Sequence, residues 1–93
     1  MLETLELNII AISTHQIVLT NSEVGLDGKP LSGTKVTQVV MKAFGYSPGL
    51  ACKIIREVEK YGKAPCFTGV HAACEKSAGL LRSLQIPCIV KPI

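Results

Sequence analysis

The sequence predicts one α/β domain, a two-layer (α+β) sandwich of order β-α-α-β-α-β with three helices on one face of a small, mainly antiparallel sheet. Two observations lead to this fold class. Three segments carry apolar residues at helical spacing, and runs of β-forming residues precede, interrupt and close the helical region. The 93 residues are 47% hydrophobic, which is enough for one packed core. We therefore expect residues 1–93 to form a single domain.

The N-terminal third is predicted to hold β-structure followed by a long loop. Residues 5–20 are rich in β-formers and are predicted to form one long strand, or a hairpin with its turn at Thr14 and His15. In both cases residues 1–15 form an N-terminal extension, either a strand or a hairpin arm. Residues 21–33 contain four glycine or proline residues and two serines, which predicts a loop. Such length in a small domain is typical of a functional or a disordered segment.

Two consecutive helices are predicted after this loop. The first spans residues 34–44, ends at Gly45 and has an apolar face formed by Val36, Val39, Val40, Ala43 and Phe44. The second has the clearest end signals, because Ser47 is an N-cap, Pro48 follows at the first helical position and Gly62 ends the helix. Its apolar stripe consists of Ala51, Ile54, Ile55, Val58 and Tyr61.

The last third is predicted to be strand, helix and strand. A short strand covers residues 64–68, and Thr68 or Gly69 opens the third helix. The expected inward face of that helix is Val70, Ala73, Cys74, Ser77, Leu80, Leu81 and Leu84. Residues 88–90 form the closing strand, and the preceding Pro87 indicates the edge of the sheet.

Four cysteines point to a reducing compartment. None forms a C-x-x-C pair, and each lies within an apolar run, where a free thiol behaves as a small hydrophobic side chain. A disulfide framework in a short secreted chain is instead typically built from cysteines in loops. We therefore expect four reduced thiols, at Cys52, Cys66, Cys74 and Cys88.

The N-terminus shows no targeting signal. The first basic residue is Lys29, whereas a secretory leader needs an early positive charge. The apolar run at residues 9–12 is far too short to cross a bilayer. The prediction is a cytoplasmic protein with no membrane partner.

A nucleotide site is not supported by the glycine-rich segment. Gly28 and Gly33 have the spacing of a phosphate loop, but that loop needs lysine before the hydroxyl residue. Here Thr34 precedes Lys35. Turn formation is the better account of these glycines, although anion binding at the start of the helix remains open.

Metal binding and cysteine catalysis are also poorly supported. His71 and Cys74 are three residues apart with Cys66 nearby, and these are residue types that bind zinc. However, Cys74 lies on the expected core face and no fourth ligand is evident. A catalytic thiolate would need a base within hydrogen-bond reach, and the cysteines are expected to be buried. We therefore predict no cofactor, no metal and no enzymatic activity.

The second helix carries a basic stripe that argues only weakly for nucleic acid. The net charge is +3, Glu57 and Glu59 interrupt the stripe, and there are too few aromatic residues for a base-stacking surface. A solvated helix exterior is the simpler interpretation of Lys53, Arg56, Lys60 and Lys63.

Three segments resemble the ClpS family, adaptors of ATP-dependent Clp proteases. They are Ile17-Val-Leu-Thr-Asn-Ser-Glu23, the run Lys35-Val-Thr-Gln-Val-Val-Met-Lys-Ala-Phe-Gly-Tyr-Ser47, and the run from Ala51 to the Gly-Lys-Ala corner at Ala64. The resemblance covers roughly residues 16–90 and rests mostly on the two helices. It implies a non-catalytic adaptor that binds the N-terminal residue of substrate proteins, the N-degron, and delivers them to a Clp AAA+ unfoldase.

The resemblance also implies a substrate site. The family's asparagine is matched by Asn21, whereas its aspartate falls on Ser22, followed by Glu23, and its histidine falls on Glu59. These groups would hold the free α-amino group, since a carboxylate complements an ammonium at least as well as an imidazole does. The apolar cup for the substrate side chain would include Val36, Ile55 and Val58.

Two departures from the family pattern matter. The loop before the first helix is longer than in the family, and an alternative register places Asp27 at the asparagine position. The unfoldase-facing residues fall on Ala72 and Ser77, and only Glu75 matches in kind.

Two other functions remain open on the same scaffold. In the first, the chain is a protein-interaction module that has lost N-degron recognition. In the second, it contacts a translation factor or a nucleoprotein, as the C-terminal domain of the ribosomal stalk protein does, and that domain has a similar topology. Indifference to N-terminal acetylation would favour the former, and steep salt dependence the latter.

Overall fold

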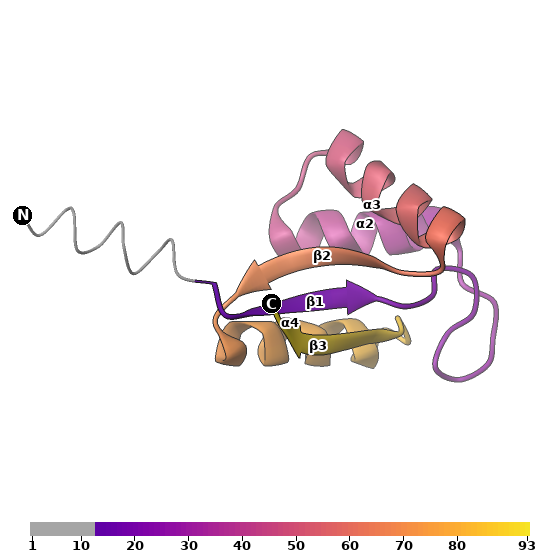
Figure 1. Cartoon of the computed structure of the whole chain (residues 1–93). Coiled ribbons are helices and arrows are strands. Elements are labelled where there is room, and N and C mark those ends of the chain that lie inside the picture. Colours follow the sequence, from indigo (N-terminus) through magenta and orange to yellow (C-terminus); the bar gives the residue numbers. More distant parts are fainter. Residues whose placement is uncertain (1–12) are drawn as a thin grey trace, which may run out of the picture.

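Six secondary-structure elements build the domain, in the predicted order (Figure 1). The computed structural model describes residues 13–93. Along the chain the elements are β1 (His15–Leu19), α2 (Gly33–Phe44), α3 (Pro48–Tyr61), β2 (Ala64–Gly69), α4 (His71–Ser83) and β3 (Cys88–Pro92). The predicted fold class is confirmed, and the part of the expected first strand that precedes residue 13 lies outside the described residues.

The sheet has β1 at its centre. Its strand order is β2-β1-β3, and both neighbours run antiparallel to β1. On one side Ile17 pairs with Val90, and on the other it pairs with Phe67, after which the register with β2 shifts. The strand that follows Pro87 is an edge strand, as predicted, and a proline at an edge disrupts no ladder hydrogen bond.

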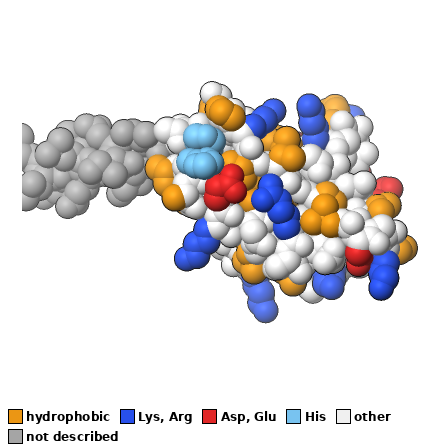
Figure 2. All heavy atoms as spheres, turned by 90° about the horizontal axis from the view of Figure 1, so that it is seen from below, with side chains coloured by type: hydrophobic (Ala, Val, Ile, Leu, Met, Phe, Trp, Pro, Cys, Tyr) orange, Lys and Arg blue, Asp and Glu red, His pale blue; other side chains and the backbone are white. Residues whose placement is uncertain are grey.

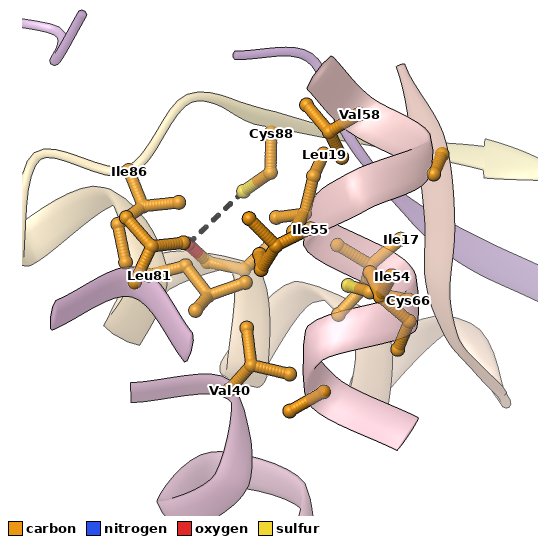
Figure 3. Close-up of a cluster of buried hydrophobic side chains, with 14 of the residues drawn as sticks. Ile17, Leu19, Val40, Ile54, Ile55, Val58, Cys66, Leu81, Ile86 and Cys88 are labelled. Atoms are coloured by element: carbon orange, nitrogen blue, oxygen red, sulfur yellow. Dashed lines mark hydrogen bonds between the residues drawn. The ribbon is translucent and has the colours of Figure 1, made fainter. Parts of the chain in front are cut away.

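All three helices contribute to one core on a single face of the sheet. Ile17 and Leu19 are two residues apart on the central strand, so their side chains point to the same face, and both are fully buried. They cluster with buried residues from every helix and from the edge strands (Figure 3). The members outside β1 include Val40, Ile54, Ile55, Val58, Cys66, Leu81, Ile86 and Cys88.

Helices α2 and α3 begin and end as their sequence signals predict. The side chain of Ser32 accepts a hydrogen bond from the backbone N–H of Lys35, and Ser47 caps α3 in the same way. Gly45 and Gly62 end the two helices in the left-handed conformation, with φ of +69° and +82°. These paired signals explain why α3 matches its predicted bounds.

The predicted inward face of the third helix was partly wrong. Val70, Leu80 and Leu84 are 48%, 50% and 37% exposed, whereas Ala78, which was not predicted, is fully buried. The helix begins at His71, after its N-cap Val70, because β2 extends to Gly69. The buried stripe is therefore Cys74, Ala78 and Leu81, whose spacings of four and three residues place them on one helical face.

Two further predictions need correction. His15 does not form a turn, because it is the first residue of β1 and pairs with Gly69 and Pro92. Tyr61 does not pack in the core, because it is the last residue of α3 and is 67% exposed.

The loop at residues 21–33 is held by its own hydrogen bonds. Backbone bonds join Gly25 to Lys29 and Leu31 to Glu23, and a bridge pairs Val24 with Pro30. The predicted loop is therefore confirmed, and it has a defined conformation at the end of β1.

No helix within residues 13–93 is long and apolar enough to cross a membrane.

Candidate functional site

A polar pocket lies where β1 ends beside the last turns of α3. Its volume is about 200 Å³. Its walls are the chain that leaves β1 and the C-terminal part of α3, namely Thr20, Asn21, Ser22, Glu23, Val58, Glu59 and Gly62. Five of the residues that the family resemblance selects, Asn21, Ser22, Glu23, Val58 and Glu59, therefore line one pocket, which we call the polar pocket.

Asn21 shapes this pocket through its backbone contacts. Its side-chain oxygen accepts hydrogen bonds from the N–H groups of Glu23, at 2.8 Å, and Val24, at 3.0 Å. A carbonyl oxygen has two lone pairs, so both are used in this turn. Asn21 is therefore a positioning residue that orders the turn and presents the next side chain.

Ser22 is the unusual residue of the pocket. Its side chain is only 3% exposed, and its hydroxyl oxygen has no hydrogen-bond partner. Most buried polar side chains are paired, because an unpaired one loses its hydration without compensation, at about 1–3 kcal/mol. Ser22 therefore leaves the hydrogen-bonding capacity of a buried hydroxyl unused in the wall of this pocket.

Together with Glu23, Glu59 supplies the negative charge of the polar pocket. Its carboxylate reaches across to the start of α2, where Oε1 is 3.8 Å from the position that a Cβ atom on Gly33 would occupy. Among residues 13–93 it forms no ion pair. The first turn of α2 has no acidic residue of its own, so the positive end of that helix faces Glu59.

The expected apolar cup is not hollow. Val36, Ile55 and Val58 are 0%, 4% and 3% exposed, because α2 and α3 pack their apolar faces against the sheet. Val58 reaches the wall of the polar pocket, but Val36 lines no pocket.

A second pocket adjoins the polar pocket at Glu59, which lines both. It lies between α2 and α3 and has a volume of about 330 Å³. We call it the α2–α3 pocket, and its walls are Gly33, Thr34, Thr37, Gln38, Cys52, Ile55, Arg56 and Glu59. Its accessible surface is mostly apolar, and the hydroxyl, amide and charged groups of Thr34, Gln38, Arg56 and Glu59 are placed around it.

Sequence reasoning missed this second pocket. The only available signal was the spacing of Arg56 and Glu59, which places two opposite charges on one side of a helix. It also missed Thr20 and Gly62 in the polar pocket, which are brought there by the ends of β1 and α3. Asp27, from the alternative register, lines neither pocket and instead accepts a hydrogen bond from the N–H of Lys29.

The three residues expected to face an unfoldase do not share one surface. Ala72 and Glu75 are exposed and lie on one side of α4. Ser77 is half-buried and lies on the other flank of the buried stripe.

Glu75 also contacts Nε2 of His71 at 3.3 Å. The rings of His71 and His15, pale blue in Figure 2, pack in a tilted arrangement with centroids 4.5 Å apart.

The residues considered for metal binding do not come together. Within residues 13–93 no group of three potential ligands is close enough to hold an ion. His71 is exposed at the start of α4, whereas Cys74 and Cys66 are buried in the core. Burial raises the pKa of the Cys66 thiol to about 12, and neighbouring Cys88 and Cys74 add to the effect. A protonated, buried thiol is a packing group, not a nucleophile.

Comparison with known proteins supports the fold. No family model and no curated protein matches the sequence. Among solved structures, Agrobacterium tumefaciens ClpS2 bound to L-phenylalaninamide superposes with a TM-score of 0.75 at 15% identity. The match covers 87% of this chain and 98% of that one. The chain shares the ClpS2 fold. That likeness was expected from the three segments quoted above, and at this identity it establishes the architecture alone.

Proposed function

We propose that this chain is a non-catalytic, adaptor-like module that binds a free protein N-terminus in the polar pocket. The observation that carries the proposal is the buried, unpaired hydroxyl of Ser22 in the same pocket as the Glu59 carboxylate. Both residues line one small pocket, and a hydrogen-bond acceptor together with a negative charge is complementary to an α-ammonium group, which has a positive charge and three donors.

The fold neighbour supports the same ligand chemistry. ClpS2 is bound to L-phenylalaninamide, whose α-amino group is free. In this chain the ammonium would pair with the Glu59 carboxylate, while Asn21 holds the turn. A hydrogen bond to Ser22 Oγ would form when the buried Ser22 side chain turns toward the pocket. Glu59 is exposed in the free protein, where a charge pair contributes only about 0–1 kcal/mol, and the contribution grows as a bound ligand excludes water from the pair. We propose the Glu59 carboxylate as the main contact of the ammonium.

Fluorescence anisotropy with matched peptides tests the proposal. Labelled peptides that begin with Phe, Leu, Asp, Asn or Gly are titrated with the protein, each with a free and with an acetylated N-terminus. We expect acetylation to weaken binding of the preferred peptides at least about tenfold, since it removes about 1.4 kcal/mol or more of charge interaction. Equal binding of free and acetylated peptides would contradict N-terminal recognition and would favour the interaction module without it.

Delivery to a Clp AAA+ unfoldase is the second half of the proposed role. The exposed side of α4 that carries Ala72 and Glu75 is the proposed contact, and Ser77 drops out because it is half-buried on the other flank. We expect Glu75→Lys to weaken co-sedimentation with the hexameric unfoldase. The matched control is Glu57→Lys, which makes the same charge change on α3. Equal retention of both variants would contradict the assignment of this face.

A further inference from the structure

The α2–α3 pocket adjoins the polar pocket at Glu59, so it is the space open to the side chain of a residue whose ammonium contacts Glu59. The three apolar side chains expected to form a cup are packed in the core, each less than 5% exposed. The open space next to Glu59 is instead the pocket between α2 and α3. A residue whose ammonium contacts Glu59 has this space within reach of its side chain.

The charged residues that line this pocket are complementary to a ligand with one positive and one negative charge. Arg56 and Glu59 are three residues apart on α3 and line the same pocket. Neither forms an ion pair with another residue in the part of the chain that the structure describes. An ammonium on Glu59 and a carboxylate on Arg56 would pair both charges at once, and guanidinium groups bind carboxylates in a favourable two-point geometry.

Other groups around the pocket can donate hydrogen bonds to a carboxylate. Gln38 provides an amide donor and Thr34 a hydroxyl, and neither side chain is engaged in a hydrogen bond among residues 13–93. The exposed face of α3 next to Arg56 carries two further basic residues, Lys53 and Lys60, which add positive potential.

We infer that the site prefers a residue with a free α-ammonium and a side-chain carboxylate, with Arg56 as the specificity-determining residue. This inference rests on the proposed function, because it assumes that Glu59 and Ser22 hold the ammonium. Two sources supply that chemistry, namely a protein whose first residue is Asp or Glu and a free acidic amino acid.

Competition anisotropy with a labelled Asp-initiated peptide tests this preference. Unlabelled competitors are peptides that differ only in a first residue of Asp, Asn or Leu, the acetylated Asp peptide, L-aspartic acid and its α-amide. Because Asn has nearly the shape of Asp but no charge, the Asp/Asn ratio isolates the carboxylate. We expect Asp to compete about tenfold better than Asn or Leu, the size of one charge-assisted hydrogen bond.

Variants of two exposed residues separate Arg56 from the general positive field. We expect Arg56→Gln to reduce the Asp/Asn ratio to about one, and the matched Lys60→Gln to leave it nearly unchanged. Lys60 loses the same charge one turn further along α3 and lines none of the described pockets. Competition by the α-amide but not by L-aspartic acid would assign the site to protein N-termini, and the reverse would assign it to a free amino acid.

The possible failures can be told apart. Better competition by Leu than by Asp, or an Asp/Asn ratio that Arg56→Gln leaves unchanged, overturns the preference. If acetylation still abolishes binding in that case, the proposed function stands. Indifference to acetylation, or no binding of any free peptide, overturns both.

Discussion

Ser22 is the residue where the demands of folding and binding conflict. The free protein buries an unpaired hydroxyl at a cost of about 1–3 kcal/mol, and the proposed ligand supplies its missing partner. We therefore expect Ser22→Ala to raise the free energy of unfolding by about 1 kcal/mol and to weaken binding of a free N-terminus about fivefold. Chemical denaturation and peptide titration on the same preparation check both changes.

A second serine provides the control. Ser83 is exposed and its hydroxyl donates to the carbonyl oxygen of Leu80 at 2.6 Å, away from both pockets. Ser83→Ala is expected to change stability by less than about 0.5 kcal/mol and to leave peptide affinity unchanged. A loss of stability in Ser22→Ala with full affinity would mean that this hydroxyl serves the fold and not a ligand.

At the scale of the elements, two glycines both have open space around the position of an added Cβ atom, but they differ in backbone conformation. Neither Gly45 nor Gly79 has an atom within 4 Å of an added Cβ. Gly45 ends α2 at φ +69°, whereas Gly79 lies within α4. We expect Gly45→Ala to destabilise the protein by about 1 kcal/mol and Gly79→Ala to stabilise it by about 0.5–1 kcal/mol. Thermal unfolding of both variants checks the signs, and two shifts in the same direction would contradict this reasoning.

The elements also show what the sequence could predict. Helix α3 was predicted to the residue because Ser47, Pro48 and Gly62 are local signals, and each acts through its own backbone. The inward face of α4 was not fully predicted, because the orientation of this helix depends on how it packs against the sheet. Small side chains at Cys74 and Ala78 face the sheet, which turns Leu80 outward. Periodicity identified Cys74 and Leu81 correctly, but it favoured the larger apolar residues Leu80 and Leu84 over Ala78.

At the scale of the whole molecule, buried thiols make stability depend on alkaline pH. Burial raises the pKa of Cys66 to about 12 from 9.0, and it also raises the pKa of Cys74 and Cys88. Between about pH 9 and 12 the folded chain keeps protons that the unfolded chain releases, so rising pH favours unfolding. We expect the free energy of unfolding to fall there by up to about 1.4 kcal/mol per pH unit from Cys66, with Cys74 and Cys88 contributing in the same direction.

Urea denaturation at successive pH values measures this slope. Cys66→Ala removes one of the titrating groups, so its slope should be shallower even though the lost side chain lowers stability at every pH. A profile that is flat from pH 9 to 11, or one whose slope is the same in Cys66→Ala, would contradict buried, protonated thiols.

The site, like the fold, was only partly predictable. The residues of the polar pocket follow one another at the end of β1 or lie in the last turns of α3, and the family resemblance selected most of them. The α2–α3 pocket has no such local pattern, because it exists only where two helices pack side by side. The burial of the residues expected to form an apolar cup was missed for the same reason. How Val36 and Ile55 pack depends on contacts between elements, which the sequence pattern does not show.

The most direct test of the central claim is a double-mutant cycle between Glu59 and the peptide's α-amino group. Affinities are measured for free and acetylated forms of one peptide, with wild type, Glu59→Gln and the control Glu57→Gln, which makes the same change two residues away. The account predicts that acetylation costs about tenfold in wild type and in Glu57→Gln, and less than about twofold in Glu59→Gln. An equal loss in all three proteins would show that Glu59 does not hold the N-terminus, and would contradict the account.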